Sequence, residues 1–329
     1  MTPFLLAAAA EPSHWLSFFL QQCVHGLTFG ALIALIALGY TMVYGIIGLI
    51  NFAHGDLFML GSFLTLALIN GLKLENAGPA KLVAGIGLLL IVVPLFCAAL
   101  NLVVDRVVYK PLRKAPKLAP LVSAIGVSFI FVNIGQFWGG SADRNVPTLV
   151  SERNVFGDRT AVAPQPNESD SVKFTYKDLL LAVTVVPTMI GLTLLVKRTK
   201  LGRAMRATAQ DPIAARLMGI PVERVIGATF LIGGALGGVA SVVYSLYINT
   251  VNFQMGYQNG LYAFTAAVLG GIGNIPGAVL GGLVIGLVRS LGSGYVSEHW
   301  VDAVIFGMLI VILVFRPTGL LGERTREKV

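Results

Sequence analysis

The chain has 329 residues, of which 55% are hydrophobic and only 12% are charged. Soluble domains carry about a quarter charged residues. This composition therefore excludes a soluble protein whose whole surface is covered by charged and polar side chains. Several apolar stretches also reach the roughly 20 residues that a helix needs to cross a bilayer core. The formal net charge of +8 comes mainly from basic residues beside these stretches, which indicates membrane orientation and not nucleic-acid binding.

The apolar stretches predict an all-α membrane bundle of eight to nine transmembrane segments, folded as a single transmembrane domain over residues 1–329. Backbone polar groups in lipid are satisfied within helices or closed barrels, and these segments are too long and too evenly apolar for barrel strands. Residues 15–27 form either an interfacial helix or an extension of the first span. The expected spans are 27–49, 56–72, 82–104, 118–139, 178–196, 225–248, 259–290 and 300–316.

Glycine is abundant, with 38 residues. Small residues let membrane helices approach closely, which matters because lipid gives helices no hydrophobic reason to associate. Pairs of small residues four apart occur at Gly26/Gly30 and Gly282/Gly286, and glycines are dense between Gly233 and Gly238. These positions predict faces on which helices pack.

The distribution of Lys and Arg predicts which side of the membrane each loop occupies, since cytoplasmic loops are enriched in both residues. The segments 105–117 and 197–224 and the C-terminal tail are strongly basic, whereas 140–177 has balanced charges. We therefore expect the first two loops and the C-terminus to be cytoplasmic and the 140–177 loop to be external. The side of the N-terminus stays open.

A polar cluster, Asn51 to Asp56, separates two apolar segments with almost no linker. Polar groups at membrane depth are costly and usually face a cavity or the bundle interior, so Asn51 and His54 are candidates for a substrate pathway. Asp56 is suited to cap the following helix. The alternative is a tight turn between helices at the membrane surface.

Two further segments are candidates for the substrate pathway. Glycines and Pro276 interrupt the span at 270–277, where Gly273 and Asn274 suit a broken or re-entrant helix of the kind that lines binding sites in transporters. The segment 244–259, which includes Asn249, is rich in amides and has no charges, so it suits the passage of a zwitterion. The alternative for 270–277 is a plain turn, and the alternative for 244–259 is an ordinary connecting loop.

The basic loop 197–224 contains a predicted short helix. Asp211 and Pro212 together form a helix start, with a capping side chain followed by proline in the first turn. The helix then has a small and apolar surface, formed by Ala214, Ala215, Leu217 and Met218, and Gly219 is placed to end it. Such a helix suits insertion into a cleft of another protein, although a helix that lies on lipid headgroups is the alternative.

Several kinds of site are not expected. The sequence has no phosphate-binding loop of the G-x-x-x-x-G-K-[ST] type, and its four histidines lack metal-ligand spacing. We therefore expect no metal, no cofactor and no enzymatic activity in this chain. The spans also contain few ionisable residues, which argues against a self-contained ion-coupled carrier.

The residues from Tyr40 to Asp56 closely resemble the first part of permeases of branched-chain amino-acid ABC transporters, of the LivH type. The pattern Ala214-Ala215-x-x-x-Gly219 looks like the core of the coupling loop of ABC importer permeases, with Ile213 in the place of the usual acidic residue. The segment from Ala267 to Gly286 also resembles this family. The likeness extends from about residue 20 to the C-terminus.

The resemblance implies a multi-pass permease subunit of the bacterial inner membrane that imports branched-chain amino acids. Its partners would be a LivM-type permease, two cytoplasmic ATP-binding subunits and a periplasmic substrate-binding protein. The resemblance also implies that the helix at 211–219 contacts an ATP-binding subunit. A urea or short-amide permease of the same family, a self-contained secondary transporter or channel, and a membrane scaffold without transport are the alternatives.

Overall fold

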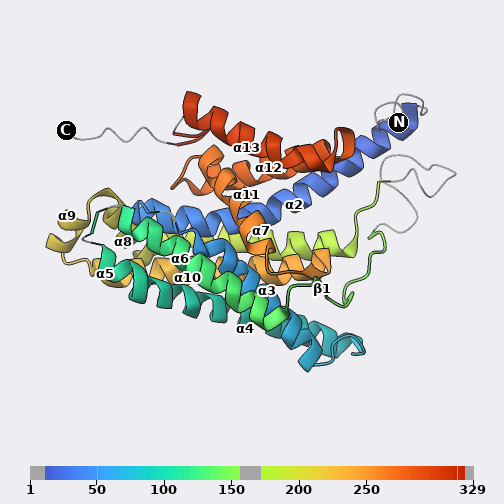
Figure 1. Cartoon of the computed structure of the whole chain (residues 1–329), viewed down its shortest axis with the longest axis horizontal. Helices are drawn as coiled ribbons and strands as arrows, with labels where there is room; N and C mark the ends of the chain where they lie inside the picture. The colour runs from blue at the N-terminus through green and yellow to red at the C-terminus, as the bar shows by residue number, and fades with distance from the viewer. Residues whose placement is uncertain are drawn as a thin grey trace.

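The computed structural model describes residues 12–49, 51–113, 115–116, 118–155, 172–316 and 318–322. Within these ranges, eight helices are long and apolar enough to cross a membrane, and they run roughly along the long axis of the molecule (Figure 1). The all-α membrane bundle predicted from the sequence is therefore confirmed. The basic positions Arg324, Arg326 and Lys328, part of the expected cytoplasmic tail, lie outside the described residues.

The bundle contains nine longer helices and several short elements among the described residues. The longer helices are α2 (Pro12–Ile47), α3 (Ala53–Gly71), α4 (Pro79–Val104), α6 (Leu118–Gly139), α7 (Tyr176–Arg198), α10 (Val222–Ile248), α11 (Met255–Gly270), α12 (Ile275–Tyr295) and α13 (Glu298–Phe315). The short elements are the π-helix η1 (Asp105–Tyr109), α5 (Lys110–Leu112), α8 (Lys200–Gln210), α9 (Pro212–Leu217), β1 (Arg144–Asn145) and β2 (Thr250–Val251). The two strands pair antiparallel, with Arg144 opposite Val251.

The short elements mark the two ends of the bundle. We call the end that carries α8 and α9 the α9 end, and the opposite end the β1 end (Figure 1). Helices α2, α3 and α10 are mostly buried, whereas α7 and α13 expose most of their apolar surface. An apolar exterior of this kind suits contact with lipid or with other membrane subunits, since lipid does not penalise it.

Glycines bring the buried helices into close contact, as the sequence predicted. A β-carbon added at Gly286 would lie 2.3 Å from the Cα of Gly30, and one added at Gly282 would lie 2.6 Å from the Cα of Ala34. Helices α2 and α12 therefore touch along their backbones. Gly238 of α10 likewise approaches Pro94 of α4 at 2.5 Å from an added β-carbon. Any larger residue at these positions would separate the helices.

Two helices begin inside the bundle and not at its ends. His54, in the first turn of α3, lies against Gly237 near the middle of α10. The start of α11 lies beside it, because a β-carbon added at Gly55 would meet the carbonyl oxygen of Gly256 at 2.4 Å. From this meeting point, α3 runs to the β1 end, where Phe63 touches Gly139, and α11 runs to the α9 end.

The structure refines three expectations about the spans. Residues 15–27 extend the first span, since α2 is one helix from Pro12 to Ile47. The segment 259–290 belongs to two helices, α11 and α12, as the broken-helix interpretation predicted. The helix expected at 56–72 begins three residues earlier, so Asp56 lies inside the first turn of α3 and does not occupy the capping position, which Phe52 holds.

Candidate functional site

A cavity of about 790 Å³ opens where α3, α6, α11 and α13 meet. Apolar side chains form most of its walls, and polar groups come from the starts of α3 and α11. The lining residues are Tyr40, Phe52, Asp56, Ile125, Ser128, Phe129, Val132, Phe253, Gln254, Gly256, Tyr257, Gln258, Gly260, Leu261, Phe264 and Asp302. A concave apolar site with a few converging polar groups is the usual form of a small-molecule site.

Asp56 is the most unusual residue of this cavity. Its side chain is buried, with the residue 1% exposed, and its Oδ2 accepts a hydrogen bond from the hydroxyl of Ser128. Its Oδ1 has no hydrogen-bond partner among the described residues, and no Lys or Arg in the described part of the chain forms an ion pair with it. A buried carboxylate without a counter-charge is costly, so its presence calls for a functional explanation.

The first turn of α11 forms the opposite wall. The side chain of Asn252 accepts a hydrogen bond from the backbone nitrogen of Gln254 at 3.1 Å, which holds the chain in a turn immediately before the helix. Gln254, Gly256, Tyr257 and Gln258 then line the cavity. The positive end of the helix dipole therefore faces the same space as the carboxylate of Asp56.

Two more ionisable residues lie in the neighbouring spans. Asp302 of α13 lines the cavity and accepts a hydrogen bond from the hydroxyl of Tyr262. Arg289 of α12 stacks its guanidinium over the rings of Phe29, 4.4 Å from the centroid, and of Tyr262, at 5.1 Å. The expectation that the spans are nearly free of ionisable groups therefore needs correction, because these residues and Asp56 lie within helices long enough to cross a membrane.

Asn51 and His54, two of the predicted pathway residues, are buried and do not line this cavity. The side-chain amide of Asn51 donates to the side chain of Asn101 at 3.1 Å, and Asn101 donates to the carbonyl of Phe230 at 2.7 Å. The ring of His54 packs edge-on against Tyr40 with centroids 4.8 Å apart. These contacts hold the start of α3 inside the bundle. The alternative interpretation of this segment, a tight turn at the membrane surface, does not agree with this burial.

Gly273 and Asn274 lie in the turn between α11 and α12, at the α9 end and away from the cavity. Gly273 has a φ of +92° and lies against Gly45, so this position favours glycine. The side chain of Asn274 accepts from the backbone nitrogen of Gly277 at 3.1 Å and donates to the carbonyl of Leu321 at 2.7 Å. Both residues shape the turn that joins α11 to α12, which agrees with the interpretation of this segment as a plain turn.

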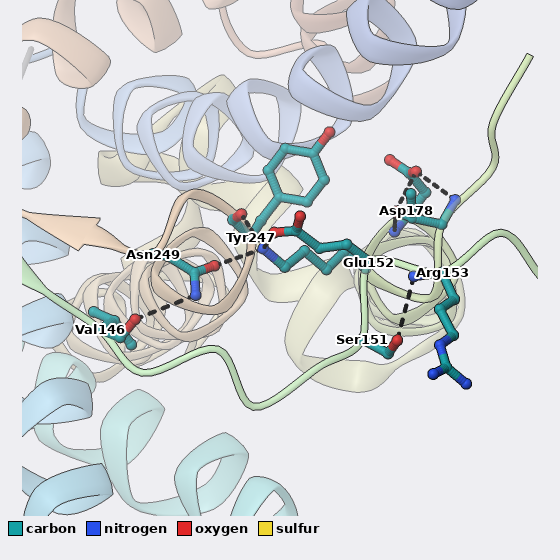
Figure 2. Close-up of polar contacts among 9 residues, drawn as sticks. Val146, Ser151, Glu152, Arg153, Asp178, Tyr247 and Asn249 are labelled. Atoms are coloured by element: carbon teal, nitrogen blue, oxygen red, sulfur yellow. Dashed lines mark hydrogen bonds and ion pairs between the residues drawn. The ribbon is translucent and has the colours of Figure 1, made fainter. Parts of the chain in front are cut away.

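Asn249 belongs to a polar network at the β1 end. It ends α10 in the left-handed conformation, with a φ of +59°, and its side-chain amide donates to the carbonyl of Val146 at 3.2 Å, as Figure 2 shows. The ammonium of Lys177 donates to the Oδ1 of Asn249 at 2.7 Å and to Glu152 at 2.6 Å. The network ties α7, α10 and the 144–155 segment together, outside the cavity.

The predicted helix in the 197–224 loop is present as α9. The side chain of Asp211 accepts hydrogen bonds from the backbone nitrogens of Ile213 at 2.8 Å and Ala214 at 3.0 Å, and Pro212 occupies the first turn. Gly219, with a φ of +81°, lies in the turn after the helix. The start and the end of the helix are thus as predicted.

The apolar surface of α9 includes Leu217 and Met218, as predicted, but not Ala215. Ala214 is exposed, but Ala215 is 4% exposed and faces the bundle. The outward face is formed by larger side chains, with exposures of 72% for Ile213, 84% for Leu217 and 82% for Met218. A helix has about 3.6 residues per turn, so Ile213 and Leu217, four apart, fall on one side.

Charged side chains connect α9 to the bundle. The guanidinium of Arg113 pairs with Asp105 of η1 and with Glu223, in the first turn of α10. Glu223 also pairs with Arg216 of α9 at 3.2 Å. A displacement of α9 would therefore be transmitted to α10 and, through η1, to α4.

The sequence matches one family over nearly its whole length. The family model for the permease component of the branched-chain amino acid transport system matches residues 22–313. The chain belongs to this family. It is a transport permease subunit and not an enzyme, as its resemblance to ABC importer permeases predicted.

Named relatives agree with this assignment. The high-affinity branched-chain amino acid transport system permease protein BraD of Pseudomonas aeruginosa is 42% identical over 94% of this chain and 98% of its own length. The corresponding LivH of Escherichia coli is 40% identical over 95% and 98%. LivM of Escherichia coli is more distant, at 24% identity over 97% of this chain and 74% of its own length. No solved structure matches the chain.

Proposed function

We propose that this chain is one permease subunit of an ATP-driven importer of branched-chain amino acids in the bacterial inner membrane. The observation that carries the proposal is the 42% identity to BraD over nearly the full length of both chains. The large apolar walls of the cavity suit the aliphatic side chains of such substrates.

The proposed complex contains a LivM-type permease, two ATP-binding subunits and a periplasmic substrate-binding protein. The distant similarity to LivM supports two related permeases that assemble side by side. Because the sequence lacks a phosphate-binding loop of its own, ATP hydrolysis is assigned to partner chains. The binding protein would deliver the substrate at the β1 end.

The α9 end is the cytoplasmic side in this proposal. Loop 197–224 carries seven Lys and Arg residues against two acidic ones, and cytoplasmic loops are enriched in Lys and Arg. The segment after α13 returns to the same end, where the backbone nitrogen of Leu320 bonds the carbonyl of Leu269 at 2.8 Å. These observations support our proposal that the C-terminus is cytoplasmic and that the 140–177 loop is external.

Helix α9 is the proposed docking element for an ATP-binding subunit. Its outward face presents Ile213, Leu217 and Met218 to solvent, and burial of one such side chain contributes about 1.5–3 kcal/mol. Closure of the ATP-binding subunits would move α9, and the ion pairs through Arg216, Glu223 and Arg113 would pass the movement to α10 and α4. The bundle would then alternate between outward and inward access.

Replacement of Leu217 by aspartate tests this proposal. We expect the Leu217→Asp variant to insert normally but to lose most of the co-purifying ATP-binding subunits, because a carboxylate would enter an apolar cleft. Val296→Asp is the matched control, since Val296 is also apolar and 59% exposed but lies at the β1 end. Retention of the ATP-binding subunits by Leu217→Asp would contradict the docking role of α9.

A further inference from the structure

We propose that the cavity between α3, α6, α11 and α13 is a binding site for the amino-acid zwitterion on its way through the membrane, with its ammonium group at Asp56 and its carboxylate at the first turn of α11. The inference rests on the proposed function, because it takes an amino acid as the transported molecule.

The carboxylate of Asp56 provides the ammonium site. It is buried, it lines the cavity, and its Oδ1 has no partner among the described residues. A substrate ammonium group would supply the missing counter-charge and the missing hydrogen bonds at once. Ser128 holds the other oxygen and so fixes the direction of the carboxylate.

The first turn of α11 provides the carboxylate site. Helix α11 has 16 residues, and the first amides of a helix point free N–H groups away from it, at the positive end of the dipole. Gly256 and Tyr257 belong to this turn and line the cavity. Gln258 also lines it, and its side-chain amide donates to the hydroxyl of Tyr262 at 3.3 Å. Because Gly256 has no side chain, this turn packs directly against Gly55 and Asp56 of α3.

The two sites are close enough for one amino acid. A β-carbon added at Gly256 would lie 2.9 Å from the Oδ1 of Asp56, so the carboxylate of Asp56 and the start of α11 are neighbours. In an α-amino acid, the ammonium and carboxylate groups are attached to the same carbon atom, so one molecule that lies across this contact from the cavity side would reach both. The aliphatic side chain would then point to the apolar wall of Ile125, Phe129 and Val132.

The other carboxylate of the cavity is less suited to this role. Asp302 comes from α13 and already accepts a hydrogen bond from Tyr262, whereas the Oδ1 of Asp56 has no partner among the described residues. The cavity, at about 790 Å³, also leaves space for water beside the substrate. Weak binding is what a transport pathway requires, since the substrate must leave again.

Protection of a cysteine in the cavity wall tests the inference. In the complete complex, Cys23 and Cys97 are replaced by alanine, and Tyr257→Cys serves as the reporter because Tyr257 is 66% exposed. We expect millimolar leucine to slow labelling of this cysteine by N-ethylmaleimide. With Asp56→Asn added, at least about tenfold more leucine should be needed for the same protection, whereas Asp143→Asn, on the exposed 141–145 segment, should leave protection unchanged.

Substrate analogues test the same point without changing Asp56. 4-Methylpentanoic acid lacks the ammonium group of leucine and 3-methylbutylamine lacks its carboxylate, so each should protect the reporter at least about tenfold less well than leucine. Equal protection by leucine with Asp56 and with Asp56→Asn, or by leucine and 4-methylpentanoic acid, would overturn the inference. If the parent complex does not take up leucine at all, the proposed function itself fails, which is a separate outcome.

Discussion

The α9 end and the mid-bundle cavity distribute polar and apolar groups in opposite ways. At the α9 end, the charged residues Arg113, Asp105 and Glu223 are paired with one another, and the apolar side chains of α9 are exposed. In the cavity, apolar side chains form most of the walls, and the Oδ1 of Asp56 lacks a partner among the described residues.

This difference indicates which kind of partner each region binds. Exposed apolar side chains on a well-capped helix are suited to another protein, which can bury them. An unpaired charge inside an apolar cavity is suited to a small molecule of opposite charge. Three substitutions test this comparison, beginning with the largest expected effect.

Arg113→Ala should have the largest effect, because it removes the cation that joins Asp105 to Glu223. The side chain of Asp105 is only 4% exposed, and removal of one partner of a buried ion pair costs about 3–5 kcal/mol. We expect uptake per ATP hydrolysed to fall at least about tenfold, while leucine still protects the cavity reporter. Arg113→Lys, which retains the charge, should recover part of the coupling. An unchanged uptake-to-hydrolysis ratio in Arg113→Ala would show that these ion pairs do not transmit the movement of α9.

Asp211→Ala should have an intermediate effect, limited to the α9 end. Loss of a helix cap costs about 1 kcal/mol, which corresponds to an equilibrium constant for helix formation that is about fivefold lower. The affinity for the ATP-binding subunits, measured by titration, should decrease by a similar factor, whereas Asp211→Asn should keep it because asparagine also caps helices. Equal affinities of Asp211→Ala and the parent chain would mean that α9 does not dock as a preformed helix.

Asn249→Gly should have the smallest effect on transport. Glycine adopts the left-handed conformation of this position without strain, so the substitution removes the amide that contacts Lys177 and Val146 but keeps the backbone. We expect lower thermal stability of the complex, by about 1–2 kcal/mol, with an initial rate of leucine uptake close to that of the parent. A severe loss of uptake in a well-assembled complex would instead place Asn249 in the substrate pathway, as the sequence suggested.

The parts of the fold that were predictable depend on local signals. Apolar length predicted the spans, the dense glycines from Gly233 to Gly238 predicted a helix-packing face, and the order of Asp211, Pro212 and Gly219 predicted α9. Each of these features is decided by neighbouring residues in the chain or by the membrane itself. The buried position of Ala215 was missed because it depends on how α9 packs on the bundle.

The cavity was harder to predict because its residues are far apart in the sequence. Asp56 was interpreted as a helix cap, and nothing in its local sequence indicates that α11 begins beside it and that Ser128 reaches its oxygen. The amide-rich segment 244–259 did contain a useful signal, since Gln254, Tyr257 and Gln258 line the cavity. Polar residues such as His54 and Asn274, which looked more like pathway residues, have structural contacts that the sequence does not show.

Reconstitution tests the central claim, namely that this chain transports branched-chain amino acids as a subunit driven by separate ATPases. Liposomes would contain the chain with its LivM-type partner, with or without the two ATP-binding subunits, and the substrate-binding protein would be supplied at the external face. The account predicts that radiolabelled leucine enters only when the ATP-binding subunits and ATP are both present, and that urea does not enter. Movement of leucine down its gradient through this chain alone would contradict it.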